Sequence, residues 1–167
     1  IQIMKQFQIL INKTIDSISS LLIFIIISLV SLVFLTVVLR YMLNISYVFL
    51  QELIMYLHAL IFMFGISYAL KEKSHVKIDV IFNSLSKKNQ LLILSTGTLI
   101  FIIPTSLFII FISMDMVIQS WSLLEGSSEA GGLDLVFLLK TIIPITGFLI
   151  FLQSISDLIN YMDSYKL

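Results

Sequence analysis

The sequence has no cysteine and little charge, and each shortage excludes a class of protein. Without cysteine the chain forms no disulfide and holds no cysteine-ligated zinc, iron–sulfur cluster or catalytic thiol. Charged residues make up 12 % of the 167 residues, against about 25 % in soluble domains. Hydrophobic residues make up 59 %, and the mean hydropathy is +1.08. Because so little charge cannot cover a water-facing surface, most of the chain lies in lipid.

A surplus of positive charge is also absent. Ten Lys and Arg residues balance ten Asp and Glu residues, for a formal net charge of zero. Proteins that bind nucleic acid typically carry a basic patch or stripe, so no nucleic-acid partner is expected. Internal repeats, low-complexity tracts and proline-rich linkers are missing too. The sequence therefore predicts a single membrane domain over residues 1–167.

Four apolar stretches are long enough to cross a bilayer, which takes about 20 helical residues. Transmembrane strands would instead show segments of about ten residues that alternate apolar and polar side chains, and no such segments occur. The sequence thus predicts an all-α integral membrane protein with four transmembrane helices. These span about residues 18–39, 48–70, 91–113 and 135–159.

The basic residues predict the orientation of these spans. Residues 71–90 carry five lysines, whereas residues 114–134 carry four acids and no base. Because cytoplasmic loops are enriched in Lys and Arg, the 71–90 loop and both termini are expected in the cytoplasm, and the 114–134 loop in the periplasm. Apolar residues at helical spacing predict a short amphipathic helix in the cytoplasmic loop, with its lysines near anionic lipid headgroups. A simple extension of the third span is the alternative. The apolar residues are Ile78, Ile81, Phe82 and Leu85.

Two ionisable side chains lie within the second span, where such groups are functional candidates by default. Glu52 lies about one turn inside the span, at the depth at which Arg40 ends the first span. A Glu52–Arg40 ion pair that joins the two helices is expected, and ion coupling through Glu52 is the alternative. His58 lies near the midplane. We expect it to hydrogen-bond to a neighbouring helix, because haem ligation by two histidines needs a second one at similar depth.

Two further residue pairs suggest packing rather than chemistry. His75 and Asp79 are four residues apart, which suits a local hydrogen bond that orients the loop, and a metal site would need a third ligand. Gly65 and Ala69 form a small-xxx-small pair that lets another helix approach the second span closely.

The acidic loop is the most polar segment outside the spans. Glu125 and Glu129 flank Ser127 and Ser128, and Gly131 and Gly132 follow. The ligand spacing of an EF-hand is absent, so a docking surface for another protein is the preferred interpretation over calcium binding. Trp121 is expected to anchor this region at the membrane interface.

No set of nucleophile, base and orienting group is present, and no pair of broken helices suggests a transport path. The chain is therefore expected to be no enzyme, to hold no metal or cofactor, and to carry no complete transport path of its own.

The order of the polar landmarks carries a family resemblance. Arg40-Tyr41 ends the first span and Gln51-Glu52 opens the second. Further landmarks follow in both halves of the chain: Gly65, Tyr68, Ala69, His75 to Asp79, Ser120-Trp121, Glu125 to Leu133, Phe137 to Lys140, Pro144 and Leu152-Gln153. Together they resemble the small membrane subunit (DctQ type) of the tripartite ATP-independent periplasmic (TRAP) transporters. The second half is similar to the branch associated with mannitol, chloroaromatic compounds and 2-oxo acids.

The resemblance implies a role in a sodium-driven secondary transporter of a bacterial inner membrane. A periplasmic binding protein would deliver an organic acid or similar small solute to the complex. A large membrane subunit (DctM type) would carry substrate and sodium as an elevator. The small subunit would enlarge the fixed scaffold and help to dock the binding protein.

By position in the family pattern, each group of candidate residues receives a role. Arg40 and Glu52 would pair helices, and Gly65, Ala69 and His58 would pack against the large subunit. His75 and Asp79 would fix the cytoplasmic loop. The docking loop would comprise Trp121, Glu125, Ser127, Ser128, Glu129, Gly131 and Gly132.

Two other classes remain as alternatives. One is a haem-bearing membrane anchor of a redox complex that uses His58. The other is a small proton-coupled four-helix exporter that uses Glu52, although such exporters usually place their acid deep in the first span.

Overall fold

The computed structural model describes residues 2–72, 82 and 84–165, and all regular structure within them is helical. Four helical stretches are long and apolar enough to cross a membrane, which confirms the predicted fold class. The third stretch is continuous through a π-helical turn. The elements are α1 (Gln2–Met42), α2 (Val48–Lys71), α4 (Lys87–Gly97), the π-helix η1 (Thr98–Ile102), α5 (Ile103–Leu123) and α6 (Val136–Tyr165).

Two helices extend well past the apolar stretches that predict them. Helix α1 begins at Gln2 and not near residue 18, because Ile11, Ile15 and Leu22 keep a buried face toward the neighbouring helices. Helix α5 continues to Leu123 and not to residue 113, because Val117 and Ser120 extend its buried face while Asp115 lies on the exposed side. The connection between α5 and α6 is therefore residues 124–135, shorter than the predicted loop.

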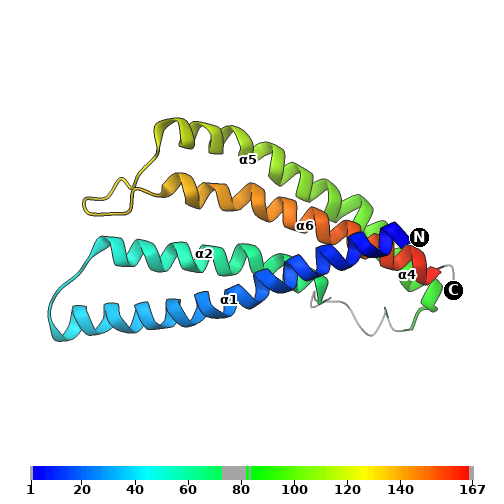
Figure 1. Ribbon diagram of the computed structural model, residues 1–167, viewed down its shortest axis with the longest axis horizontal. Helices are drawn as coiled ribbons and strands as arrows, with labels where there is room; N and C mark the ends of the chain where they lie inside the picture. The colour runs from blue at the N-terminus through cyan, green and yellow to red at the C-terminus, as the bar shows by residue number, and fades with distance from the viewer. Residues whose placement is uncertain (1, 73–81, 83, 166–167) are drawn as a thin grey trace.

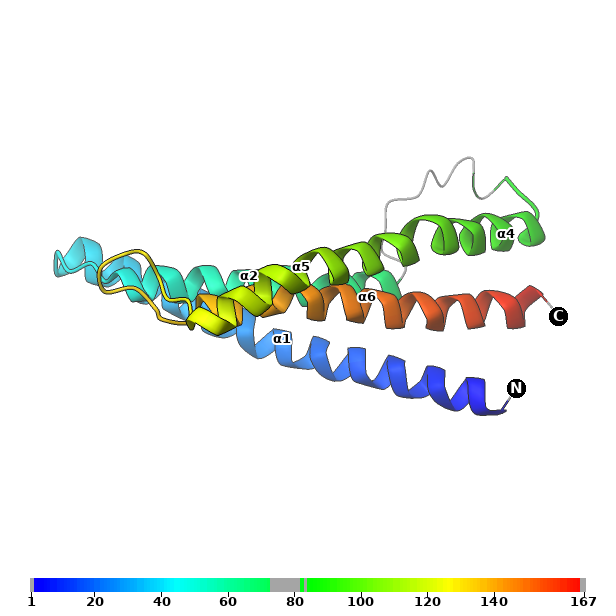
Figure 2. The same cartoon turned by 90° about the horizontal axis from the view of Figure 1, so that it is seen from above.

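The helices form a thin bundle in which α6 occupies the centre. Helix α6 contacts α5, α2, α1 and α4, and Figure 1 shows α5, α6, α2 and α1 side by side in that order. The α1–α2 and α5–α6 connections lie at one end of the molecule, the loop end, and the chain termini lie at the other, the terminal end. Seen at right angles, the helices overlap in a narrow layer at the loop end and separate into α4, α6 and α1 at the terminal end (Figure 2). Many large apolar side chains on the four spans are exposed.

Small hydroxyl side chains fill the contacts between the helices. Most of these hydroxyls donate to a carbonyl three or four residues earlier in their own helix, as Ser106 does to Ile103 and Ser113 to Ile109. Their polarity is thereby satisfied without a cross-helix partner, and their small size lets the helices approach. The buried Ser and Thr residues are Ser67, Thr98, Ser106, Ser113, Ser120, Thr146, Ser154 and Ser156.

Helices α5 and α6 are in close contact at Gly147. A Cβ atom at this position would lie 2.9 Å from Cγ1 of Ile110 and 3.1 Å from the backbone oxygen of Ser106. Only glycine fits there without displacing α5, so the packing of these two helices depends on this residue.

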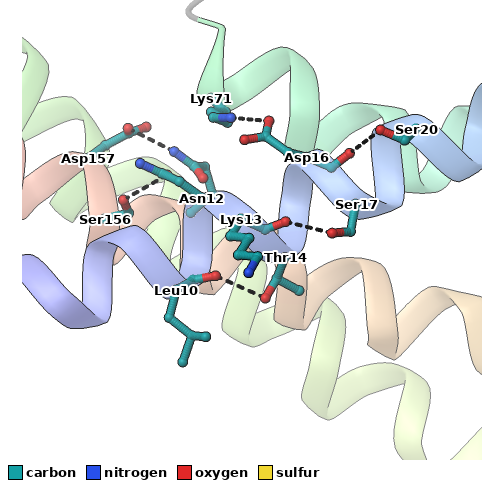
Figure 3. A network of polar contacts seen from close by, with 11 residues as sticks. Leu10, Asn12, Lys13, Thr14, Asp16, Ser17, Ser20, Lys71, Ser156 and Asp157 are labelled. Atoms are coloured by element: carbon teal, nitrogen blue, oxygen red, sulfur yellow. Dashed lines mark hydrogen bonds and ion pairs between the residues drawn. The ribbon is translucent and has the colours of Figure 1, made fainter.

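Polar contacts join the helices at the terminal end (Figure 3). Lys71, the last residue of α2, forms an ion pair with Asp16 of α1. The hydroxyl of Ser156 on α6 donates to Oδ1 of Asn12 on α1, at 3.2 Å. The ion pair holds α1 against the end of α2, and the Ser156–Asn12 hydrogen bond holds α1 against α6. The predicted amphipathic helix over residues 78–85 falls mostly on residues 73–81 and 83, which lie outside the described residues.

Candidate functional site

The α5–α6 loop, residues 124–135, folds into a compact turn through its own backbone. Leu124 ends α5 in the left-handed conformation, with φ of 45°. The amide of Ser127 donates to the carbonyl of Leu133, and the amide of Gly132 donates to that of Glu129, both at 3.0 Å. Gly131 has φ of 78°, a conformation that costs glycine little and other residues more. The loop is thus held in a compact conformation by hydrogen bonds within its own backbone.

Glu52 anchors this loop to the start of α2. Its Oε1 accepts a hydrogen bond from the hydroxyl of Ser127, and its Oε2 accepts one from the backbone amide of Leu133 at 2.6 Å. Both carboxylate oxygens are therefore occupied by residues 75 and 81 positions later in the chain. Hydrogen bonds to an ionised acceptor are stronger than those between neutral groups.

The predicted Glu52–Arg40 pair is wrong. Within the described residues Arg40 forms no ion pair with Glu52, and its side chain is exposed at the end of α1. The carboxylate of Glu52 turns toward the α5–α6 loop instead, because a hydroxyl and a backbone amide both reach it there.

The close fit around Glu52 explains the glycine at position 132. A Cβ atom on Gly132 would lie 2.8 Å from Oε1 of Glu52 and 2.6 Å from Cβ of Ser127. Any side chain at this position would therefore push the carboxylate or the serine away. Gly132 belongs to the anchoring geometry and not to the exposed part of the loop.

A second glutamate anchors the loop to α5 and α6. The Oε2 atom of Glu125 accepts hydrogen bonds from the hydroxyl of Ser120, at 2.6 Å, and from the ammonium group of Lys140, with which it forms an ion pair. Ser120 lies in the last turn of α5 and Lys140 in the second turn of α6. The hydrogen bond from Lys140 is the main cause that lowers the pKa of the Glu125 carboxyl below its ordinary value of 4.5, followed by the bond from Ser120.

This lowered pKa predicts the pH dependence of the Glu125 anchor. A carboxyl whose pKa is lower in the folded state contributes stability above its ordinary value of 4.5. That contribution is lost as the pH falls through the lowered pKa. We expect Lys140→Met to raise the pKa of Glu125 toward 4.5, because the main cause of its depression is removed. An NMR titration of labelled glutamate side chains in micelles measures this shift, and an unchanged pKa in Lys140→Met would contradict the assigned cause.

Trp121 also joins α5 to α6. Its indole Nε1 donates to the hydroxyl of Thr141 at 2.8 Å, and its ring meets that of Phe137 edge-on, with 4.7 Å between the centroids. Its role as an interfacial anchor stays a prediction. As the single tryptophan of the chain, it makes a fluorescence probe of this helix pair.

The tip of the α5–α6 loop is free of these anchoring contacts. Ser128, Glu129, Ala130 and Gly131 are exposed, whereas Glu125, Ser127 and Gly132 are partly covered. The predicted docking residues therefore divide into two groups. The covered ones shape the loop, and the exposed ones are available to another molecule.

The remaining candidates on α2 lie on a face directed away from the rest of the chain. His58 is exposed, and its ring packs on Phe62 with 4.6 Å between the centroids. A Cβ atom on Gly65 would meet nothing within 4 Å, and Ala69 is half-buried.

The two candidates of the cytoplasmic loop, His75 and Asp79, lie outside the described residues. No group of three or more His, Cys, Asp or Glu residues in the part of the chain that the structure describes is placed to bind a metal ion.

Sequence reasoning named Ser120, Leu133 and Lys140 only as family landmarks and did not predict that they hold the loop from the other side. Ser120 and Lys140 complete the Glu125 anchor, Thr141 binds Trp121, and the amide of Leu133 binds Glu52. A basic residue in the second turn of an apolar helix was the available signal for Lys140. A backbone amide leaves no signal in the sequence at all.

Comparison with known proteins gives one family. The family model described as "Tripartite ATP-independent periplasmic transporters, DctQ component" matches residues 29–163. No curated protein matches the chain. The matched range includes the last third of α1, all of α2 and α5, the α5–α6 loop with both glutamate anchors, and nearly all of α6.

Proposed function

Because the chain belongs to the DctQ family of TRAP transporter components, we propose that it scaffolds a sodium-driven uptake system for organic acids or related small solutes. As the small membrane subunit, it would hold the large DctM-type subunit in place and help to dock the periplasmic binding protein. The system would lie in a bacterial inner membrane, with the loop end periplasmic and the terminal end cytoplasmic, as the distribution of lysines suggests.

The composition of the exposed face of α2 carries this proposal. Residues at intervals of three and four along this face form the α2 stripe, and most of them are exposed. The stripe holds an amide, an imidazole and two small residues at membrane depth. Polar and ionisable groups in a span are costly against lipid, and small residues favour close helix packing. A helix of the large subunit suits this surface better than lipid does. The stripe consists of Gln51, Met55, His58, Phe62, Gly65 and Ala69.

The α5–α6 loop supports the docking role. Its tip, residues 128–131, is exposed and carries the charge of Glu129. The Glu52 and Glu125 anchors fix the base of the loop to three helices. A surface held in one conformation loses less entropy when a partner binds.

A pair of photo-cross-linkers tests the scaffold role. A photoreactive amino acid replaces Phe62 of the α2 stripe in one variant and Phe34 of α1 in another. Both phenylalanines are exposed, at 63 % and 69 %. In native membranes we expect position 62 to cross-link to a larger multi-span protein, to be identified by mass spectrometry, and position 34 to label mainly lipid. Equal yields of that protein at both positions, or lipid alone at position 62, would contradict the proposal.

A further inference from the structure

A buried polar pair lies in the second half of α6, far from the two glutamate anchors of the loop. The side chains of Gln153 and Asp157 are 1 % and 4 % exposed. They are one helical turn apart, and Nε2 of Gln153 donates to Oδ1 of Asp157 at 3.0 Å. At about 1.5 Å per residue they lie about 26 and 32 Å from Val136, the first residue of α6, towards the terminal end (Figure 1). Gln153 is one of the family landmarks to which no role has been assigned.

The amide oxygen of Gln153 is buried and has no hydrogen-bond partner within the part of the chain that the structure describes. The hydroxyl donors of two neighbouring residues are directed elsewhere. Ser154 donates to the carbonyl of Ile150 at 2.7 Å, and Ser156 donates to Oδ1 of Asn12. A buried acceptor without a donor is destabilising and calls for a ligand such as an ion or a water molecule.

The amide oxygen and the carboxylate are close enough to bind one ion together. The nitrogen and oxygen of an amide are about 2.3 Å apart, so Oε1 of Gln153 lies within about 5 Å of Oδ1 of Asp157. Hard cations bind oxygen ligands at about 2.3–2.6 Å, so two of their ligands can be up to about 5 Å apart. Calcium sites commonly combine several carboxylates, whereas this pair contains one. Its charge therefore suits a monovalent cation.

The end of α2 lies near this pair and adds to its preference for positive charge. Leu70 and Ile150 line the same small cavity, and α2 and α6 run in the same direction (Figure 1). Gln153 is one turn further along α6, so it lies near the level at which α2 ends at Lys71. The last carbonyls of a helix carry partial negative charge, which favours a cation nearby. The ammonium group of Lys71 itself is bound to Asp16 of α1.

We propose that Gln153 and Asp157 bind a monovalent alkali-metal cation between α6 and the end of α2. Oε1 of Gln153 and the carboxylate of Asp157 would be its side-chain ligands. Such a site needs no group of three His, Cys, Asp or Glu residues, because an amide oxygen supplies one ligand. The cation would satisfy this oxygen and compensate the buried carboxylate, whereas a water molecule would satisfy only the oxygen. The site depends on the packing of α6 and not on the proposed transport role.

The ion dependence of the stability of the purified full chain tests this site. The chain is kept in an uncharged detergent with choline chloride, which is replaced stepwise by sodium or potassium chloride at constant ionic strength. The emission of Trp121 follows thermal unfolding. Binding of radioactive sodium, or of rubidium as a substitute for potassium, is counted separately. Gln153→Leu and Asp157→Asn each remove one ligand, whereas Asp115→Asn removes the same charge from an exposed position on α5 and is the matched control.

In the native chain and in Asp115→Asn we expect a saturable rise of several degrees in Tm with sodium or potassium, and the ion that gives the larger rise identifies the cation. Gln153→Leu and Asp157→Asn should lose most of this rise. Equal Tm values in choline, sodium and potassium would overturn the proposal, as would a rise that both ligand variants retain. Stabilisation by acid alone would overturn it too, because a proton on Asp157 would then supply the donor that Gln153 lacks. Absence of saturable ion binding by the native chain would overturn it even if a variant fails to fold.

Discussion

Replacing Gly147 with leucine is expected to unfold the contact between α5 and α6. Even the Cβ atom of the new side chain would lie 2.9 Å from Ile110 and 3.1 Å from the backbone of Ser106. Overpacking of a well-packed core typically costs about 1–3 kcal/mol, and here the backbone itself must move. Trp121 on α5 binds Thr141 on α6, so its emission reports on the affected helix pair. Denaturant or thermal unfolding of the purified protein, followed by this emission, measures the loss.

Gly65 provides the matched control on a neighbouring helix. A Cβ atom there meets nothing within 4 Å, so Gly65→Leu should leave the unfolding transition of the isolated chain nearly unchanged. If the α2 stripe packs against the large subunit, the same substitution should reduce recovery of that subunit in a pull-down. Equal destabilisation by the two substitutions would show that the packing derived for Gly147 is wrong.

Replacing Glu52 with alanine is expected to release the α5–α6 loop from α2. The amide of Leu133 and the hydroxyl of Ser127 both lose their acceptor. We expect hydrogen exchange in the 126–134 peptide to accelerate by an order of magnitude or more, as the loop opens locally. If the loop docks the binding protein as proposed, solute uptake by a reconstituted transporter should fall strongly, because the loop is no longer held in place. Mass-spectrometric hydrogen exchange and uptake into proteoliposomes measure the two effects.

Two further variants separate the anchor from the charge of the loop. Ser127→Ala removes one of the two hydrogen bonds to Glu52 and should give an intermediate acceleration of exchange. Glu129→Gln removes a negative charge from the exposed tip of the same loop and should leave exchange at Leu133 unchanged. If Glu52→Ala and Glu129→Gln accelerate exchange equally, the exchange rate of the loop depends on its negative charge and not on its hydrogen bonds to Glu52.

The apolar runs were sufficient to predict the number and type of the spans, because a helix in lipid must satisfy its backbone internally. They were not sufficient to predict where the helices end. Helix α5 continues through Asp115 and Gln119, because its buried face at Ser113, Val117 and Ser120 continues to pack on α6. That face contains two serines, so hydropathy alone does not mark it as buried.

The partner of Glu52 shows a different limit of sequence reasoning. Arg40 was the nearest opposite charge at the same expected depth, and an ion pair between the first two helices followed from that proximity. The actual donors are a hydroxyl and a backbone amide, 75 and 81 residues away. Only the closure of the α5–α6 loop brings them to α2. Glu52 could thus be identified as a candidate from its position in the span, but its hydrogen-bond partners could not be predicted from the sequence.

The central place of α6 has a consequence for biosynthesis. Helix α6 leaves the ribosome after the other three spans, yet α5 packs mainly on α6, and α2 borders α6 as far as α2 extends. Spans one and two can pair as they enter the bilayer, but the third waits for the fourth before it has a neighbour to pack on. The bundle is therefore complete only after α6 has been synthesised. Membrane quality-control proteases should accordingly degrade chains that terminate before residue 136 faster than full-length chains.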